Sequence, residues 1–117
     1  MDAFTHAYIE AALWSSTDNS DDRGGEPLDA NYGAGDLAPA TLARMVEDCQ
    51  AFQRDNAGDI AGDPERAGHD FWLTRNGHGA GFWDGDWSEE AGERLTAASH
   101  AYGSYELYVG DDGLIHG

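Results

Sequence analysis

The sequence predicts an α+β domain in which three helices pack on a small antiparallel sheet built from two hairpins, with a long acidic loop. Three stretches repeat apolar residues at helical spacing, and two pairs of short apolar runs flank glycine-containing turns. A chain of 117 residues has room for one modest hydrophobic core. We therefore expect residues 1–117 to form a single acidic domain.

The first helix is expected over residues 3–15. Its apolar residues recur at helical spacing, at Phe4, Tyr8, Ala11 and Ala12, with Ile9 and Leu13 widening the stripe. Residues 16–38 then form a long polar segment, whose glycines disfavour regular structure. A loop of this length in a compact domain is usually functional or disordered, and we expect Leu28 and Tyr32 to attach it to the core.

The second helix begins at Pro39, a favourable first helical residue, and should fray by Asn56 and Gly58. One face of it is apolar, formed by Leu42, Met45, Val46, Cys49 and Phe52. Cys49 is the only cysteine, which excludes an intrachain disulfide and a zinc site built from cysteines. We expect its thiol to serve as a small buried hydrophobe.

Residues 58–69 are predicted to form a second polar loop, and residues 70–84 a β-hairpin. The aromatic and β-branched side chains of residues 70–75 are typical of a strand, and residues 80–84 would return as its partner. Asn76 and Gly77 between them favour a tight turn.

The third helix is expected to be capped by Asp86, with Glu89 as its partner in a capping box. Its buried face is formed by Ala91, Leu95, Ala98 and Tyr102, and Gly103 ends it. A second hairpin completes the sheet, with strands at residues 105–109 and 114–116 joined by a turn at residues 110–113.

The charge is the outlying property of this chain. Aspartate and glutamate total 23, against six arginines and no lysine, which gives a formal net charge of -17. This charge disfavours direct binding to nucleic acid, because proteins bind phosphates through basic side chains. Four uses of the acidity remain open, namely solubility, adaptation to high salt, weak cation binding, and a negative surface for a basic partner.

The amino-terminal segment predicts neither a signal peptide nor a membrane span. Its apolar stretch from Phe4 to Trp14 is interrupted by His6 and Glu10, and no basic region precedes it. The use of a single cysteine fits a reducing compartment. We therefore expect a cytoplasmic location.

Carboxylates on the long loop, on the polar face of the second helix and at the start of the third helix are expected to form one continuous negative surface. A rigid acidic surface can occupy a basic groove by imitating the positions of DNA phosphates. The candidate partner-binding residues are Asp18, Asp21, Asp22, Glu26, Asp29, Glu47, Asp48, Glu89, Glu90 and Glu93. The competing interpretation is an acidic surface that is merely solvated.

An alternative site lies in the dense group of aromatic and polar residues from position 69 to position 86. On the predicted hairpin, these residues would form a binding module for a small ligand or a peptide. The candidate ligand-binding residues are Trp72, Arg75, His78 and Trp83.

The same segment offers a third interpretation, a metal-dependent hydrolase with His69, His78 and Asp84 as metal ligands. A strand rises about 3.3 Å per residue, so His78 near the turn would lie roughly 15–20 Å from the base of the hairpin. The segment also contains no serine in a nucleophile-elbow motif and no phosphate-binding loop pattern. We therefore expect a protein that is not an enzyme and needs no cofactor or metal.

Four segments carry a resemblance to known proteins. They are Ala12-Leu13-Trp14-Ser15-Ser16, Gly25-Glu26-Pro27-Leu28-Asp29-Ala30-Asn31-Tyr32, Phe71-Trp72-Leu73-Thr74-Arg75-Asn76-Gly77-His78-Gly79-Ala80-Gly81-Phe82-Trp83-Asp84 and Leu107-Tyr108-Val109-Gly110-Asp111-Asp112-Gly113. In these segments the chain resembles a family of small acidic proteins of tailed bacteriophages and prophages. The resemblance implies a context of host takeover or anti-defence, in which some small acidic proteins act as DNA mimics. The expected partner is then a basic nucleic-acid-binding protein in the cytoplasm of a bacterial host.

Overall fold

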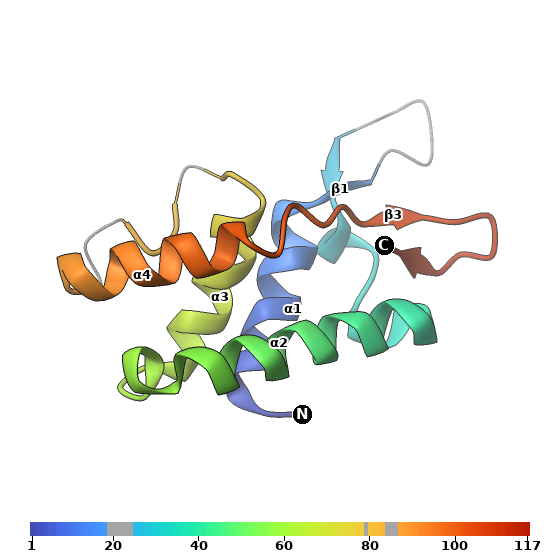
Figure 1. The fold of residues 1–117 in the computed structure, drawn as a ribbon. Helices are drawn as coiled ribbons and strands as arrows, with labels where there is room; N and C mark the ends of the chain where they lie inside the picture. Colours follow the sequence, from blue (N-terminus) through green and yellow to red (C-terminus); the bar gives the residue numbers. More distant parts are fainter. Residues whose placement is uncertain (19–24, 79, 84–86) are drawn as a thin grey trace.

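The computed structural model describes residues 1–18, 25–78, 80–83 and 87–117, and within these ranges it is α+β (Figure 1). Four helices are present, α1 (Ala3–Ser15), α2 (Pro39–Ile60), α3 (Pro64–Arg75) and α4 (Glu89–His100). Two antiparallel sheets of two strands each accompany them, β1 (Thr17–Asp18) with β2 (Glu26–Pro27) and β3 (Tyr108–Val109) with β4 (Ile115–His116). Two short 3₁₀ turns, η1 (Leu28–Ala30) and η2 (Ala34–Asp36), lead from β2 to α2. The predicted α+β class is confirmed, whereas the structure has one helix more than predicted.

Helix α1 forms the centre of the molecule and has the predicted bounds. Asp2 caps it by accepting a 2.8 Å hydrogen bond from the backbone N–H of Thr5. Helix α1 packs against α2, α3 and η1, so its buried residues surround the helix axis rather than forming a single stripe. Gly68 of α3 lies directly on the backbone of Phe4, where a Cβ atom would overlap the Phe4 carbonyl group. Glycine at this position therefore allows the close approach of α1 and α3.

Aromatic rings fill the space between α1, α2 and α3. Phe52 of α2 stacks on Phe71 of α3, with 4.1 Å between the ring centroids, and Phe4 lies against both rings. The predicted apolar face of α2 is confirmed, since Met45, Cys49 and Phe52 are fully buried. The helix does not end near Asn56 as predicted. It kinks there, at φ -125° and ψ 20°, and continues to Ile60.

Helix α3 replaces the second half of the predicted loop at residues 58–69 and the first strand of the predicted hairpin. Asp63 caps this helix by accepting a hydrogen bond from the backbone N–H of Arg66, and Pro64 is its first residue. At the other end, Gly77 adopts a φ of +69°, and His78 donates its backbone N–H to the Leu73 carbonyl. The Asn-Gly pair therefore caps a helix rather than turning a hairpin. Residues 80–83 form a bend and a turn instead of a returning strand.

Helix α4 has the predicted buried face but a different cap. Ser88, and not Asp86, caps the helix by accepting a hydrogen bond from the Ala91 backbone N–H, and Asp86 lies outside the described residues. Leu95 is fully buried, and the chain turns away after the helix at Gly103, whose φ is +72°. The predicted stop is thus confirmed.

The second predicted hairpin is present in a shorter form, as β3 and β4, with Tyr108 opposite His116 and Val109 opposite Ile115. Ile115 is fully buried, and its carbonyl accepts a 2.9 Å hydrogen bond from the Ala38 backbone N–H just before α2. The other hairpin, β1–β2, lies within the predicted loop. There Leu28 is fully buried, as expected of a residue that attaches the loop to the core.

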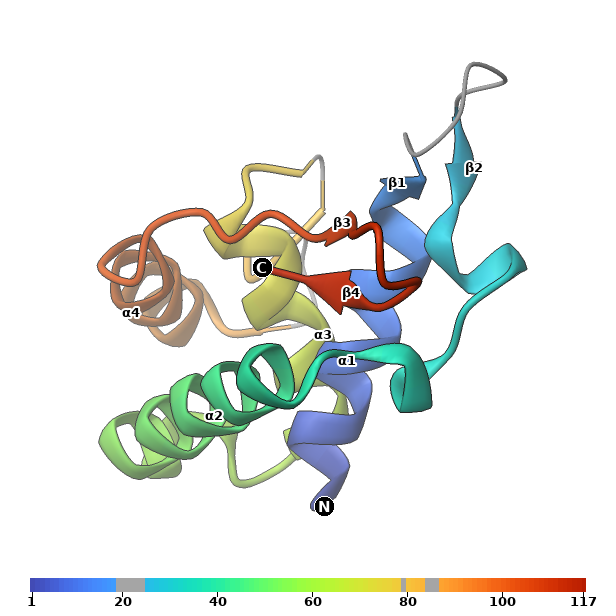
Figure 2. The same ribbon diagram turned by 90° about the vertical axis from the view of Figure 1, so that its right-hand side faces the viewer.

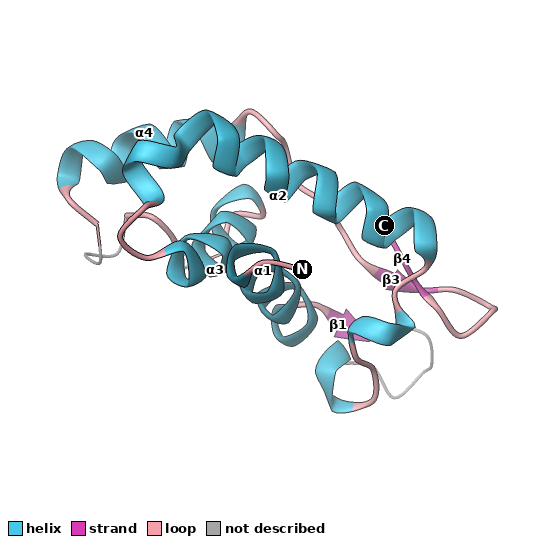
Figure 3. Cartoon of the chain, turned by 90° about the horizontal axis from the view of Figure 1, so that it is seen from below, coloured by secondary structure: helices cyan, strands magenta, loops and turns pink. Residues whose placement is uncertain are grey.

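The helices form the body of the molecule, and the two sheets are small and peripheral (Figures 2 and 3). The predicted small antiparallel sheet is thus present as two separate two-stranded sheets, and the helices pack mainly on one another. Helix α4 lies at the end opposite the β3–β4 hairpin, which gives the molecule extents of 43 × 26 × 21 Å.

Candidate interaction surface

Most of the predicted partner-binding carboxylates lie on the surface. Asp18 is half-buried, and Asp21 and Asp22 lie outside the described residues. The exposed members of the set are Glu26, Asp29, Glu47, Glu89, Glu90 and Glu93. These side chains come from β2, η1, α2 and α4, so the sequence placed most of the set correctly in solvent.

Asp48 is the exception, because it faces the core and pairs with Arg75. The Asp48 Oδ2 atom accepts a 2.9 Å hydrogen bond from the Arg75 guanidinium, and only 8% of Asp48 is exposed. The guanidinium also donates to the Tyr8 hydroxyl and to the carbonyls of Tyr102 and Gly103. Burial raises the pKa of the Tyr8 hydroxyl, which therefore stays protonated. Asp48 is thus a structural residue and does not belong to the partner-binding set.

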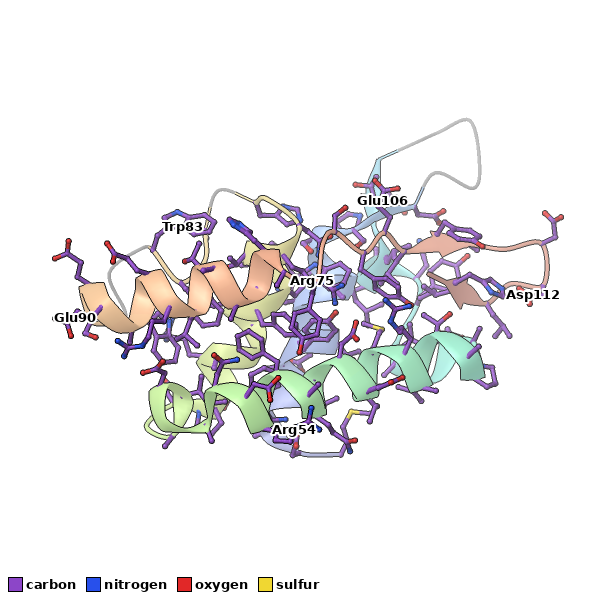
Figure 4. All side chains as sticks on the ribbon, in the orientation of Figure 1. Arg54, Arg75, Trp83, Glu90, Glu106 and Asp112 are labelled. Atoms are coloured by element: carbon purple, nitrogen blue, oxygen red, sulfur yellow. The ribbon has the colours of Figure 1, made fainter. Side chains whose placement is uncertain are left out.

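The acidity extends well beyond the predicted residues. Further exposed carboxylates belong to Glu10, Asp55, Asp63, Glu65, Glu106, Asp111 and Asp112. Figure 4 shows Glu90 at one end of the long axis, Asp112 at the other end and Glu106 between them. Negative charge therefore spans the whole length of the molecule instead of a single patch.

Each arginine that the structure describes has a carboxylate within salt-bridge distance. The pairs are Arg44 with Asp48, Arg54 with Asp55, Arg66 with Asp63, Arg75 with Asp48, and Arg94 with Asp59. The last pair is bidentate, with distances of 3.0 and 2.6 Å, and the hydrogen bonds from Arg94 lower the pKa of Asp59. The described surface consequently presents carboxylates that outnumber and neutralise its cations.

Of the four residues of the alternative site, Trp72 and His78 border one hollow, whereas Arg75 and Trp83 lie elsewhere. Arg75 is in the core, and Trp72 is 2% exposed and donates its indole N–H to the Ser15 hydroxyl at 2.7 Å. His78 is half-buried and borders a hollow of about 370 Å³ with one edge of Trp72, near β1. Trp83 is 48% exposed and lies beside α4, in a different hollow. The predicted site depended on a hairpin that the chain does not form.

Polar residues of the segment from residue 69 to residue 83 instead make hydrogen bonds that stabilise the fold. The Thr74 hydroxyl accepts a 3.1 Å hydrogen bond from the Phe82 backbone N–H, which fixes the bend after α3. The buried Asp70 carboxylate accepts a 2.7 Å hydrogen bond from the Trp87 indole N–H. These long-range contacts account for the density of polar and aromatic residues in this part of the sequence.

Two hollows on the surface contain residues that the sequence did not single out. The larger, about 500 Å³, lies between α4 and the segment around Trp83, and includes Trp87 and Thr96. The other, about 430 Å³, lies beside Trp14, which stacks on His69 at 5.8 Å between ring centroids. The sequence does not predict the larger hollow, because the hollow depends on how the bend around Trp83 packs against α4.

The proposed metal ligands are not gathered at one place. His69 borders the hollow beside Trp14, His78 borders the hollow near β1, and Asp84 lies outside the described residues. Within the described ranges, no three side chains of histidine, cysteine, aspartate or glutamate are arranged to hold a metal ion.

None of the helices in the described ranges is both long enough and apolar enough to cross a membrane. Comparisons of the chain with protein-family models, curated proteins and solved structures found no match.

Proposed function

We propose that this protein is a phage-derived, non-enzymatic inhibitor that occupies the basic nucleic-acid-binding site of a host defence or DNA-processing protein. The observation that carries the proposal is the distribution of charge. Carboxylates line the full length of an elongated body, and every described arginine is paired with one of them. Such a surface attracts a basic groove, and its described arginines are already neutralised by carboxylates.

The linear density of charge supports this proposal. B-DNA carries one phosphate charge per about 1.7 Å of helix axis, so a duplex of the same 43 Å length carries about 25 charges. The protein carries a formal charge of -17. Its charge per unit length is thus of the same order as that of DNA. A groove that attracts DNA through its positive charge would therefore attract this protein as well.

The resemblance to small acidic phage proteins supports the proposed context, a bacterial cytoplasm in which a host enzyme is the target. The proposal assigns no catalytic residue. The single thiol, Cys49, is fully buried, and burial raises its pKa, so it is not a nucleophile in the folded protein.

The test is capture of host proteins on the immobilised chain, from a bacterial lysate freed of nucleic acid by nuclease, followed by elution with short duplex DNA. The proposal expects elution of nucleic-acid-binding proteins by the duplex, and weaker capture at 0.5 M than at 0.05 M salt because salt screens the surface. Immobilised polyglutamate is the control for capture by charge alone. Recovery of no nucleic-acid-binding protein at either salt concentration overturns the proposal.

A matched variant sharpens the test. Glu89→Gln, Glu90→Gln and Glu93→Gln together remove three exposed charges from α4, and these side chains make no hydrogen bond within the described residues. The proposal expects reduced capture with a melting temperature lowered by no more than about 8 °C, because the two charges in the first turn of α4 each stabilise the helix by about 0.3–1 kcal/mol. Equal capture by the variant would show that this part of the surface takes no part in binding.

A further inference from the structure

The larger surface hollow combines an aromatic wall with two exposed carboxylates and a threonine hydroxyl. We call it the Trp83 hollow, and its principal residues are Phe82, Trp83, Trp87, Glu89, Glu93 and Thr96. Its volume of about 500 Å³ is within the range of ordinary ligand sites, about 300–1,000 Å³. It is therefore large enough for one long side chain of a partner.

The aromatic wall of the hollow is held in place by the core. The Trp87 indole N–H donates to the buried Asp70 carboxylate at 2.7 Å, and the Trp87 ring packs edge-on against Phe82 at 5.4 Å between centroids. Gly92 of α4 allows the helix to approach this wall, because a Cβ atom there would lie 2.7 Å from the Phe82 carbonyl oxygen. Phe82 and Trp87 are consequently held in place before any ligand arrives, and the half-exposed Trp83 ring borders the same hollow.

Three polar side chains of the hollow, those of Glu89, Glu93 and Thr96, have no ion pair or hydrogen bond within the described residues. The exposed carboxylates of Glu89 and Glu93 form no ion pair within the described residues. The Thr96 hydroxyl oxygen is buried and has no hydrogen-bond partner in the described part of the chain. A buried hydroxyl without a partner is unfavourable, so a donor that reaches it gains more than an ordinary surface hydrogen bond.

We propose that the Trp83 hollow binds an arginine side chain of the partner protein. A guanidinium is planar, weakly hydrated and has only donors, so it can stack on an indole ring, pair with the two carboxylates and donate to the Thr96 hydroxyl. A lysine ammonium is compact and strongly hydrated, and it gains less from an aromatic wall. The inference rests on the proposed function for the identity of the partner, because basic nucleic-acid-binding sites are rich in arginine.

The test is an NMR titration of the protein with the capped tripeptide acetyl-Gly-Arg-Gly-amide, with its lysine and citrulline analogues as separate arms. The arginine peptide should shift the Trp83 indole resonance and the α4 amide resonances near Thr96. The neutral citrulline analogue should bind at least about tenfold more weakly, since it keeps the shape and loses the charge. Equal binding of citrulline, or shifts confined to other surfaces, would overturn the proposal.

Two variants of the hollow and one control variant distinguish this site from nonspecific binding. Trp83→Ala should weaken binding about tenfold, whereas Trp14→Ala, which removes a tryptophan of similar exposure beside another hollow, should leave it unchanged. Thr96→Val should weaken binding about fivefold without lowering the melting temperature, since the hydroxyl makes no hydrogen bond in the free protein. Equal losses from Trp83→Ala and Trp14→Ala would refute a specific site.

The outcomes of this titration and of the lysate capture are independent. Arginine-peptide binding at the hollow without capture of any nucleic-acid-binding protein would refute the proposed function alone. Capture and release by duplex DNA, with unchanged affinity for the captured partner in Trp83→Ala, would refute the arginine site alone.

Discussion

Replacing Arg75 with alanine removes the cation around which four parts of the chain are arranged. Its guanidinium bonds to Asp48 of α2, to the Tyr8 hydroxyl of α1 and to two carbonyls that follow α4. Only 1% of the Arg75 side chain is exposed, so water cannot replace these bonds without opening the core. The substitution therefore leaves a carboxylate, a hydroxyl and two carbonyl oxygens short of a donor.

The expected loss of stability is at the lower end of the range for breaking a buried pair, about 3–5 kcal/mol, because Arg44 lies 3.5 Å from Asp48 and keeps a partial partner for it. A domain of this size has a total unfolding free energy of roughly 5–15 kcal/mol, so the variant should still fold. At about 4 °C per kcal/mol, the melting temperature should fall by roughly 12 °C or more.

Thermal unfolding followed by circular dichroism measures this effect, with Arg54→Ala as the matched control. Both substitutions remove one positive charge, but the Arg54 side chain is 73% exposed, and its ion-pair partner among the described residues is the neighbouring Asp55 at 3.5 Å. The control should shift the melting temperature by no more than about 4 °C, as exposed pairs contribute roughly 0–1 kcal/mol. If the two variants melt within about 3 °C of each other, the assignment of Arg75 to the core is wrong.

Three further predictions concern the fold and its titratable groups. Gly68→Ala should lower the unfolding free energy by about 1–3 kcal/mol or more, because its methyl group would overlap the α1 backbone, whereas Gly58→Ala in open space should be neutral or stabilising in the same denaturant titration. The Asp59 carboxyl should titrate below its ordinary pKa of 3.8 when followed by NMR. The stability that its pair with Arg94 contributes is therefore present above about pH 4 and is lost as the pH falls through the lowered pKa. An unchanged Asp59 titration midpoint in Arg94→Gln would contradict this. Cys49 should react with a thiol reagent only after unfolding, and rapid labelling of the native protein would disprove its burial.

Local patterns were sufficient to predict α1, the apolar face of α2 and the β3–β4 hairpin. In each case the residues that make the pattern lie close together in the sequence, and the stop signal at Gly103 belongs to a local turn. Leu28 was also identifiable, since it is one of the few large apolar residues in a polar segment that folds back on the core.

The β-branched and aromatic residues of α3 favour a strand, whereas the signals at its two ends favour a helix. Asp63 followed by Pro64 is a helix start, and Asn76 followed by Gly77 is a helix end, and both were present in the sequence. What the sequence does not reveal is that Gly68 and Phe71 face α1, which makes the helix the better way to bury this aromatic run.

The candidate surface was predictable residue by residue, but its geometry was not. Exposure of an acidic side chain follows from composition, whereas the burial of Asp48 depends on Arg75, which lies 27 positions away. The Trp83 hollow likewise depends on the packing of α4 against a bend, and Thr96 becomes notable only when its buried hydroxyl is found without a partner.

Competition with DNA on a purified partner tests the central claim most directly. The partner released from the immobilised protein by duplex DNA is bound to a fluorescent duplex, and the anisotropy of the label is followed as the acidic protein is added. If the acidic surface occupies the nucleic-acid-binding site, the anisotropy falls to the value of the free duplex. A rise in anisotropy, showing a ternary complex of duplex, partner and acidic protein, would contradict the account.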